Sequence, residues 1–283
     1  MSRILLVNPP FYRFLGSHYN ANSLGIAYIA SHLNANGHDA WLYNADFVNK
    51  DSYSNLQDIF SQFSEYTEYF KNEDADIWNE VVEKIIEFQP EWVGYTSYTA
   101  NISSIDIISR KLKERYPKIK QVIGGVHATL DPLVLQSVPA IDFAIRREGE
   151  IALLDLVNGK EPKSISGVVA RGFNILNNSK AIVNRDIDSL EFPERDKLWS
   201  LTKAEKNTVD VSYICSIRGC PYRCNYCASP FHWGRDQTQF RSPESVLSEM
   251  RHLKENYWDT GKGFDYSASA NSEAKGNLII KDN

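Results

Sequence analysis

The first 150 residues alternate short apolar segments with segments of helical periodicity, and this alternation restricts the fold more than any other feature. We predict strands at residues 4–7, 40–43, 92–97, 121–123 and 143–145. Strands that alternate with helices indicate a parallel sheet with helices on both faces. Ligands of such α/β sheets bind beyond the carboxyl ends of the strands. The loops that follow these five strands are therefore the candidate ligand site.

Helix signals separate the predicted strands. Ser23 is expected to cap the first helix and Gly37 to end it. The acidic and aromatic stretch at 55–88 predicts two helices, and Pro117 ends the helix before the fourth strand. Five such units predict a flavodoxin-like, doubly wound sheet at the amino-terminal end.

Composition is typical of an intracellular enzyme. The chain has 283 residues, 42% of them hydrophobic, which is enough for a core and about two domains. Its net charge of -5, without a block of lysine or arginine, excludes the charge pattern of a nucleic-acid binder. The longest apolar run near the amino end covers residues 4–7, too short for a signal peptide or membrane span. We expect a cytoplasmic protein with no membrane partner.

Three of the four cysteines lie close together in the sequence. Cys220, Cys224 and Cys227 have the spacing C-x3-C-x2-C, which offers three thiolates and omits a fourth. Clustered thiolates select zinc or an iron-sulfur cluster. A zinc site needs a fourth ligand, for which His232 is a candidate, and a redox dithiol is a further alternative. Cys215 lies in an apolar run at 211–217, where we predict a strand with a buried cysteine that is not a ligand.

The cysteine spacing, with Gly219 and Pro221 beside it, resembles the radical S-adenosylmethionine (SAM) superfamily. The resemblance implies a four-iron four-sulfur cluster held by the three cysteines. In that family the open iron chelates SAM, and one electron from the reduced cluster cleaves it to a 5'-deoxyadenosyl radical. Tyr226 matches the family position near the adenine. Asp282, at the end of a later predicted strand, falls near the position of the SAM amino group.

The loops after the amino-terminal strands carry a second resemblance, to the cobalamin-binding domain that precedes the radical SAM domain in one subfamily. It covers residues 3–155. The matching residues are Asn8, Pro9, Pro10, Phe11, Leu24, Gly25, Gly94, Thr96, Ser97, Gly124, Gly125, His127, Glu148, Gly149 and Glu150. The resemblance implies that cobalamin binds at these loops.

The residue types suggest roles in that site. Gly124 and Gly125 let the backbone approach a bulky nucleotide tail, and Thr96 and Ser97 have hydroxyls that can donate to it. The chain lacks the Asp-x-His-x-x-Gly signature that supplies a histidine to cobalt. The lower face of cobalamin is therefore expected to meet the loop at 8–12. His127 either contacts the periphery of the ligand or is a surface residue of its loop.

Two other interpretations of the amino-terminal domain stay open. A plain nucleotide-binding sheet is one, although no Gly-x-Gly-x-x-Gly follows the first strand. The other is a domain that binds nothing and only packs on its neighbour.

The pattern divides the chain into three parts. Residues 1–160 form the cobalamin-binding domain, and 161–207 form a linker with a hairpin whose strands lie at 165–169 and 181–183. Residues 208–283 form the first part of a βα barrel. Seventy-six residues suffice for about two βα units, whereas a whole barrel needs ~250, so the barrel is expected to be truncated.

Within the barrel portion one helix and one strand are predicted. Ser242 caps the helix, and a strand follows at 278–280. The apolar face of the helix is expected to consist of Val246, Leu247, Met250 and Leu253.

Together the resemblances imply a cobalamin-dependent radical SAM enzyme, most often a methyltransferase. Its substrate would be a small molecule or natural product, and flavodoxin or ferredoxin would donate electrons. A cyclase or oxidoreductase of the same family is an alternative. A module that carries cobalamin without turnover is another.

Overall fold

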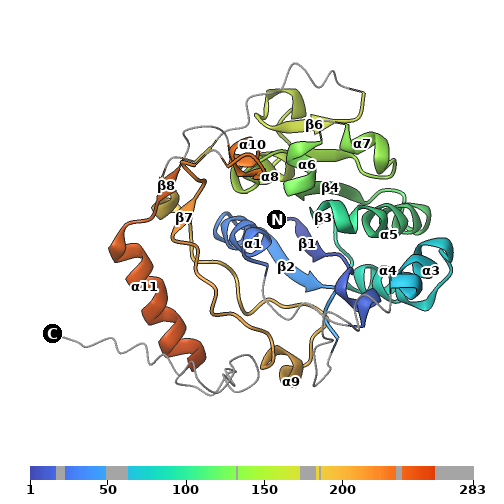
Figure 1. The fold of residues 1–283 in the computed structure, drawn as a ribbon, viewed down its shortest axis with the longest axis horizontal. Coiled ribbons are helices and arrows are strands. Elements are labelled where there is room, and N and C mark those ends of the chain that lie inside the picture. The colour runs from blue at the N-terminus through green and yellow to red at the C-terminus, as the bar shows by residue number, and fades with distance from the viewer. Residues whose placement is uncertain are drawn as a thin grey trace.

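The computed structural model describes residues 1–16, 23–48, 63–131, 133–172, 183–184, 186–222, 224–233 and 238–258. A six-stranded sheet with the order β2-β1-β3-β4-β5-β6 forms its centre (Figure 1). Strands β1 to β5 run parallel and β6 runs antiparallel to β5. The strands are β1 Arg3–Asn8, β2 Asp39–Asn44, β3 Trp92–Ser97, β4 Lys120–Gly125, β5 Phe143–Ile145 and β6 Val168–Ala170.

Helices cover both faces of the sheet. They are α1 Leu24–Ala35, α3 Phe63–Lys71, α4 Asp76–Phe88, α5 Ile102–Arg115, α6 Val126–Leu130, α7 Val134–Ser137 and α8 Glu150–Val157. Because side chains alternate along a strand, Leu5 and Val93 pack with α4 and α5, whereas Ile4 and Leu6 pack with α1 and α8. The structure therefore has the doubly wound, flavodoxin-like arrangement that the sequence predicts, with all five predicted strands present.

The start of α1 differs in detail from the prediction. Ser23 occupies the cap position, but its side chain makes no capping hydrogen bond. Its backbone carbonyl accepts from the N–H of Ala27 instead. Gly37 follows the helix with a φ of +82°, a left-handed conformation that glycine adopts without strain.

The linker adds to both edges of the sheet. The first strand of the predicted hairpin exists as β6. It pairs with β5, and so extends the central sheet, where the sequence predicts a separate hairpin. Most of the second predicted strand, at 181–183, lies outside the described residues. At the other edge, the backbone of Leu42 in β2 exchanges hydrogen bonds with Lys197 and Trp199.

The carboxyl-terminal part consists of short elements beside α1. They are α9 Lys203–Lys206, β7 Ile217–Arg218, α10 Ser229–Trp233, β8 Gln239–Phe240 and α11 Pro243–Leu253. Strands β7 and β8 pair antiparallel, and the three cysteines lie on the connection between them. The predicted strand at 278–280 and Asp282 lie outside the described residues.

The strand predicted at 211–217 is not formed over most of its length. This segment is irregular up to β7, and Cys215 is half-buried, with its thiol donating to the carbonyl of Ile217 at 3.3 Å. The reason is that arginines take up the backbone carbonyls that a neighbouring strand would need. The Arg195 guanidinium donates to the carbonyls of Val211 at 2.9 Å and Tyr213 at 3.1 Å.

The buried face of α11 also differs from the prediction. Ser242 caps the helix as expected, by accepting from the N–H of Ser245 at 3.1 Å. Leu253 is fully buried, but Leu247 is exposed and the other wholly buried side chain is that of Glu249. An apolar pattern cannot reveal such a face, because the charge at its centre is neutralised by residues from elsewhere in the sequence.

Candidate cofactor site

A cavity of about 280 Å³ lies at the carboxyl ends of β3, β4 and β5, between the sheet and helices α1 and α8. Its deeper wall is apolar and includes Leu6, Gly94 and Val122. Residues from the approach to the cysteine loop, Cys215 and Arg218, close another side. Apolar cavities with few polar groups, at this place in a doubly wound sheet, are typical ligand sites.

Part of the predicted cobalamin set lines this cavity. Thr96, Gly124, Gly125, Glu148 and Gly149 all belong to its wall. A second cavity, of about 410 Å³, has other members of the set on its wall. They are Asn8, Pro9 and Phe11, together with Ser23, Asp46 and Tyr98. Tyr98 lines both cavities, so the two lie side by side at one edge of the sheet. Pro10 is buried, and its carbonyl accepts from the Ser104 hydroxyl at 2.8 Å.

Different physical constraints explain why glycine stands at three positions of the cavity wall. A Cβ on Gly94 would meet Leu6 Cδ2 at 2.7 Å. A Cβ on Gly125 would meet the backbone N and O of Ser97 at 2.8 Å, and its φ is +96°. The pairing of β4 with β3 therefore requires glycine at 125, whether or not a ligand is bound. Gly124 is different, because the nearest atom to its Cβ is the Ile145 carbonyl oxygen at 3.8 Å.

Two predicted contacts are occupied within the protein. Ser97 is fully buried, and its hydroxyl donates to the Gly124 carbonyl at 2.6 Å and accepts from the N–H of Ala128 at 3.2 Å. Its predicted donation to a nucleotide tail is wrong, since that hydrogen is already used. His127 has Nδ1 at 3.0 Å from Thr99 Oγ1 and Nε2 at 3.7 Å from an Asp131 carboxylate oxygen. Those partners hold the ring within its own loop.

Asp46 holds the loop after β1 and was missed by the sequence analysis. Its buried carboxylate accepts from the N–H groups of Phe11 at 2.7 Å, Tyr12 at 3.1 Å and Arg13 at 3.0 Å. Burial raises the pKa of Asp46 to about 6, although these three donors act in the opposite direction. An aspartate just after a second strand is the only signal, and nothing local relates it to a loop 34 residues earlier.

The three motif cysteines lie on an accessible loop. Cys224 is exposed, and Cys220 and Cys227 are half-buried free thiols. Gly219, with a φ of +87°, turns the chain into the loop, and the N–H of Cys227 donates to the Cys224 carbonyl at 3.0 Å. Three thiols without a fourth are a donor set that fits a four-iron cluster with one open iron. Their assignment to a cluster stays a prediction.

Other predicted residues near the loop are placed as follows. Tyr226 is 93% exposed, so its ring is accessible to a ligand. Among the described residues, no three cysteine, histidine, aspartate or glutamate side chains gather closely enough to hold one metal ion. His232, the candidate fourth ligand of the zinc alternative, packs its ring edge-on against Trp233, with the ring centroids 4.8 Å apart.

A buried ion-pair group joins the start of the cysteine loop to the cavity. Arg218 Nη1 lies 3.2 Å from Glu148 Oε1, and Nη2 lies 2.7 Å from Glu150 Oε1, with all three side chains 8% exposed or less. The guanidinium also lies over the Tyr28 ring, 4.9 Å from its centroid. Burial raises the pKa of Glu148 above its usual value, although the N–H of Asn184 and Arg218 oppose that shift.

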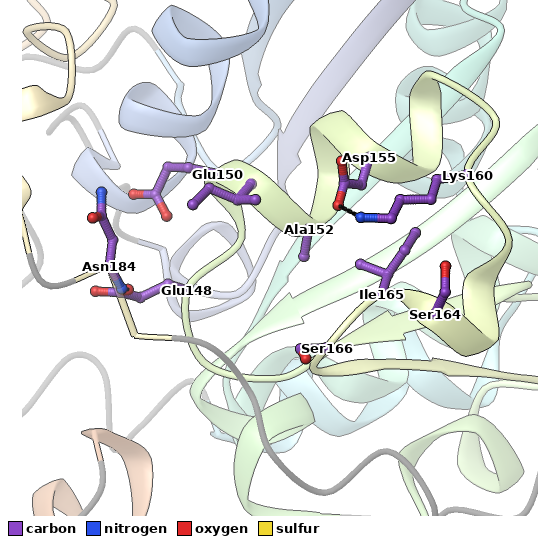
Figure 2. A pocket seen from close by; sticks show the side chains of 10 residues that line it. Glu148, Glu150, Ala152, Asp155, Lys160, Ser164, Ile165, Ser166 and Asn184 are labelled. Carbon is purple, nitrogen blue, oxygen red and sulfur yellow. Dashed lines mark hydrogen bonds and ion pairs between the residues drawn. The ribbon is translucent and has the colours of Figure 1, made fainter.

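These carboxylates also border a separate cavity of about 60 Å³ on the other side of α8 (Figure 2). Figure 2 shows Glu148 and Asn184 at one end, and an ion pair between Asp155 and Lys160 at the other. The carboxylate of Glu148, predicted to contact cobalamin, is therefore committed to Arg218 and the Asn184 N–H. Only its backbone and stem remain for a ligand.

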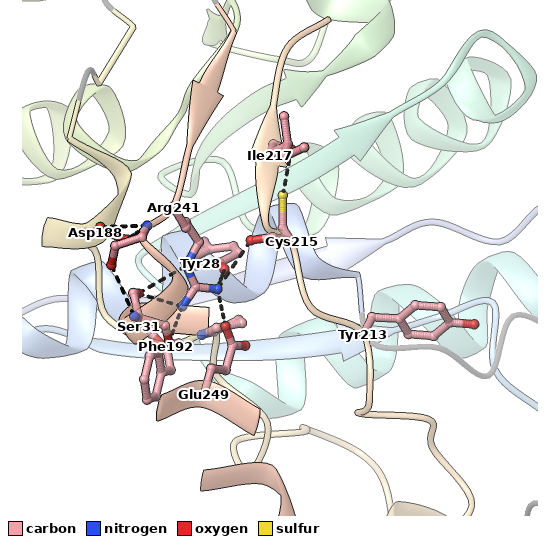
Figure 3. Close-up of polar contacts among 12 residues, drawn as sticks. Tyr28, Ser31, Asp188, Phe192, Tyr213, Cys215, Ile217, Arg241 and Glu249 are labelled. Atoms are coloured by element: carbon pink, nitrogen blue, oxygen red, sulfur yellow. Dashed lines mark hydrogen bonds and ion pairs between the residues drawn. The ribbon is translucent and has the colours of Figure 1, made fainter. Parts of the chain in front are cut away.

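A second buried group of charges fixes the chain that enters the loop (Figure 3). Glu249 of α11 pairs with Arg195 of the linker and with Arg241, and none of the three side chains is more than 4% exposed. Arg241 also donates to the Cys215 carbonyl at 3.2 Å. The linker, α11 and the approach to the cysteines are thus held as one unit.

No helix among the described residues is long and apolar enough to cross a membrane.

The family model for the B12 binding domain matches residues 16–157, which is half of the chain. An uncharacterised methyltransferase of Pyrococcus horikoshii is 27% identical over 186 residues, which cover 64% of this chain and 40% of the relative. The anaerobic magnesium-protoporphyrin IX monomethyl ester cyclase of Cereibacter sphaeroides is 31% identical over 193 residues, which cover 65% of this chain and 31% of the relative.

Solved structures give a similar fold. The radical SAM methyltransferase TsrM of Kitasatospora setae, with cobalamin and a [4Fe-4S] cluster bound, matches with a TM-score of 0.60 at 17% identity. The match covers 90% of this chain and 47% of that one. This chain therefore spans less than half the length of each of these relatives.

Proposed function

The chain belongs to the B12-binding domain family, and from this premise we propose that it contributes the cobalamin and iron-sulfur sites of a radical SAM methyltransferase. The cofactors are cobalamin, a four-iron four-sulfur cluster and SAM. Relatives in the methyltransferase and cyclase families support this set.

The observation that carries the proposal is the buried contact of Arg218 with Glu148 and Glu150. Arg218 stands two residues before the first motif cysteine, and both glutamates line the cavity of about 280 Å³. Two sites that acted separately would not need a buried charge group between them, because such groups cost desolvation free energy. The contact fixes the cysteine loop next to the cavity.

The chain's own residues have separable tasks in this proposal. The cavity with Leu6, Gly94 and Val122 on its wall would receive the apolar nucleotide end of cobalamin. Asp46 keeps the loop at 8–12 in one conformation for the corrin face. Cys220, Cys224 and Cys227 would hold the cluster, with Tyr226 beside the SAM adenine and Asp282 near the SAM amino group. When bound, the cluster and cobalamin supply electron transfer and methyl transfer respectively.

A cyclase of the same family is the second candidate. The similarity to the magnesium-protoporphyrin ester cyclase, at 31% identity, favours it. Both candidates would act on a small molecule or natural product and would draw electrons from flavodoxin or ferredoxin. A carrier of cobalamin without turnover is the remaining alternative.

The products of SAM distinguish these functions. The protein, loaded anaerobically with both cofactors, would be incubated with SAM and a chemical reductant. Cleavage to 5'-deoxyadenosine supports a radical SAM enzyme. S-adenosylhomocysteine formed in addition supports a methyltransferase, because SAM then also donates its methyl group. 5'-Deoxyadenosine alone supports the cyclase, and neither product supports the carrier.

A further inference from the structure

Arg147 has an unusual backbone for its residue type. It is the second residue after β5. Its φ is +65°, in the left-handed region that favours glycine. Its N–H donates to the Thr129 hydroxyl at 2.8 Å, which holds the residue in this conformation. A strained conformation that the surrounding structure maintains points to a functional reason for the residue.

Arg147 lines the cavity of about 280 Å³. Among the described residues its guanidinium is free, with no hydrogen bond or ion pair. The two nearest carboxylates in the sequence, Glu148 and Glu150, are both bound to Arg218. A guanidinium facing a largely apolar cavity without an acidic partner is a site for an anion.

His232 faces the same cavity from α10. Its Nδ1 is buried and has no hydrogen-bond partner among the described residues. Arg147 and His232 line the same cavity, and the pKa of His232 is lowered by burial and then by the positive charge of Arg147. A neutral imidazole can still donate one N–H to an anion beside the guanidinium.

We propose that Arg147 and His232 bind the phosphodiester of the cobalamin nucleotide tail. This inference rests on the proposed function. The phosphodiester is the one anionic group of cobalamin, since the side chains of the corrin ring end in neutral amides. It joins the corrin to the base, so a base against Leu6, Gly94 and Val122 puts the phosphate nearer the ends of the strands. Arg147 follows the end of β5, where that phosphate is expected.

Two corrinoids and two Arg147 variants test the proposal. The probes are hydroxocobalamin and dicyanocobinamide, which has the corrin ring but no phosphate or base. The variants are Arg147→Gly, which removes the charge, and Arg147→Lys, which keeps it. Glycine suits a φ of +65°, so Arg147→Gly is expected to melt no lower than wild type.

Binding is followed by equilibrium dialysis with the 283-residue chain. The expected result is a loss of roughly ten- to hundredfold in hydroxocobalamin affinity for Arg147→Gly, with less than a twofold change for cobinamide. Arg147→Lys should lose less, and His232→Gln should weaken hydroxocobalamin alone.

Two results overturn the inference. One is an unchanged affinity of Arg147→Gly for hydroxocobalamin, and the other is an equal loss for both corrinoids. Wild-type protein that binds neither corrinoid contradicts the proposed function itself, and this control is read before any variant.

Discussion

Arg218 and Glu150 form a buried ion pair, with Nη2 and Oε1 2.7 Å apart, although 68 residues separate them in the sequence. Arg218 begins the turn into the cysteine loop, and Glu150 begins α8 at the wall of the cavity of about 280 Å³. Glu148 completes the group. The pair therefore relates the position of the predicted cluster to the position of the predicted cobalamin.

Removing Arg218 is expected to destabilise the protein strongly. The Arg218→Met variant leaves two buried carboxylates without their cation, which should lower the free energy of unfolding by about 3–5 kcal/mol at pH 8. Without the cation, the folded-state pKa of Glu148, which burial already raises, rises further above its unfolded value. The loss should therefore be larger at pH 8 than at pH 5, where the Glu148 carboxylate takes up a proton more readily. Urea denaturation at both pH values measures it.

The matched control is an ion pair between Asp155 of α8 and Lys160, which follows that helix. Lys160 and Asp155 also form an ion pair at 2.8 Å, but their side chains are 50% and 29% exposed. The Lys160→Met variant should change the free energy of unfolding by less than about 1 kcal/mol. Equal effects of the two substitutions would show that Arg218 is an ordinary surface charge.

Asp46 should make the stability depend on pH in an identifiable window. Its pKa is about 6 in the folded protein, whereas an ordinary aspartate titrates near 3.8. Between these values the unfolded state loses the proton first, so the contribution of Asp46 to stability falls as the pH rises from about 4 to about 6. Above pH 6 it is constant. The total change is about 3 kcal/mol for a shift of this size.

The comparison with Asp46→Asn isolates this contribution. The difference in unfolding free energy between wild type and the variant should change between pH 4 and 6 and stay flat up to pH 8. In the folded protein the amide signals of Phe11 and Arg13 should move with a midpoint near pH 6, because their N–H groups donate to this carboxylate. A difference that does not vary with pH would refute the account of Asp46.

The cysteines provide a test with an internal control. Alanine at any one of Cys220, Cys224 and Cys227 should abolish iron retention and the brown colour after anaerobic reconstitution. Cobalamin binding should persist. Cys215→Ala should retain the iron, since we predict that this thiol is not a ligand. Loss of iron in Cys215→Ala would show that the fourth cysteine belongs to the cluster site.

A substitution at Gly124 should have the opposite effect to the cysteine variants, with loss of cobalamin and retention of iron. A Cβ there has room, because its nearest atom is 3.8 Å away, and Gly124 lines the cavity of about 280 Å³, so a valine would take up space in it. Gly124→Val should reduce cobalamin affinity at least tenfold and leave the iron content unchanged. Gly125 is a poor test, since a side chain there would clash with the backbone of Ser97. Unchanged cobalamin binding by a folded Gly124→Val would exclude this cavity as the cobalamin site.

The sequence predicts the sheet well because its signals are local. The apolar runs around Ile4 and Val93, and the helix ended before Pro117, each act over a few residues. The loops after the strands could be predicted for the same reason, since the carboxyl ends of parallel strands meet at one edge.

The missed features all involve charges that meet over long separations. Asp46, Arg218 and Glu249 look like surface residues in the sequence, yet each is buried and has a partner more than 30 residues away. Local pattern cannot reveal such pairs. The same limit explains Ser97, whose hydroxyl is used by the backbone of the neighbouring strand and loop.

The most direct test of the central claim is metal analysis after anaerobic reconstitution with iron, sulfide and hydroxocobalamin, followed by desalting. We predict about four irons and one cobalt per chain, with the absorption of both chromophores. Iron without cobalt would contradict the cobalamin site, and cobalt without iron would contradict the cluster assignment of the three cysteines.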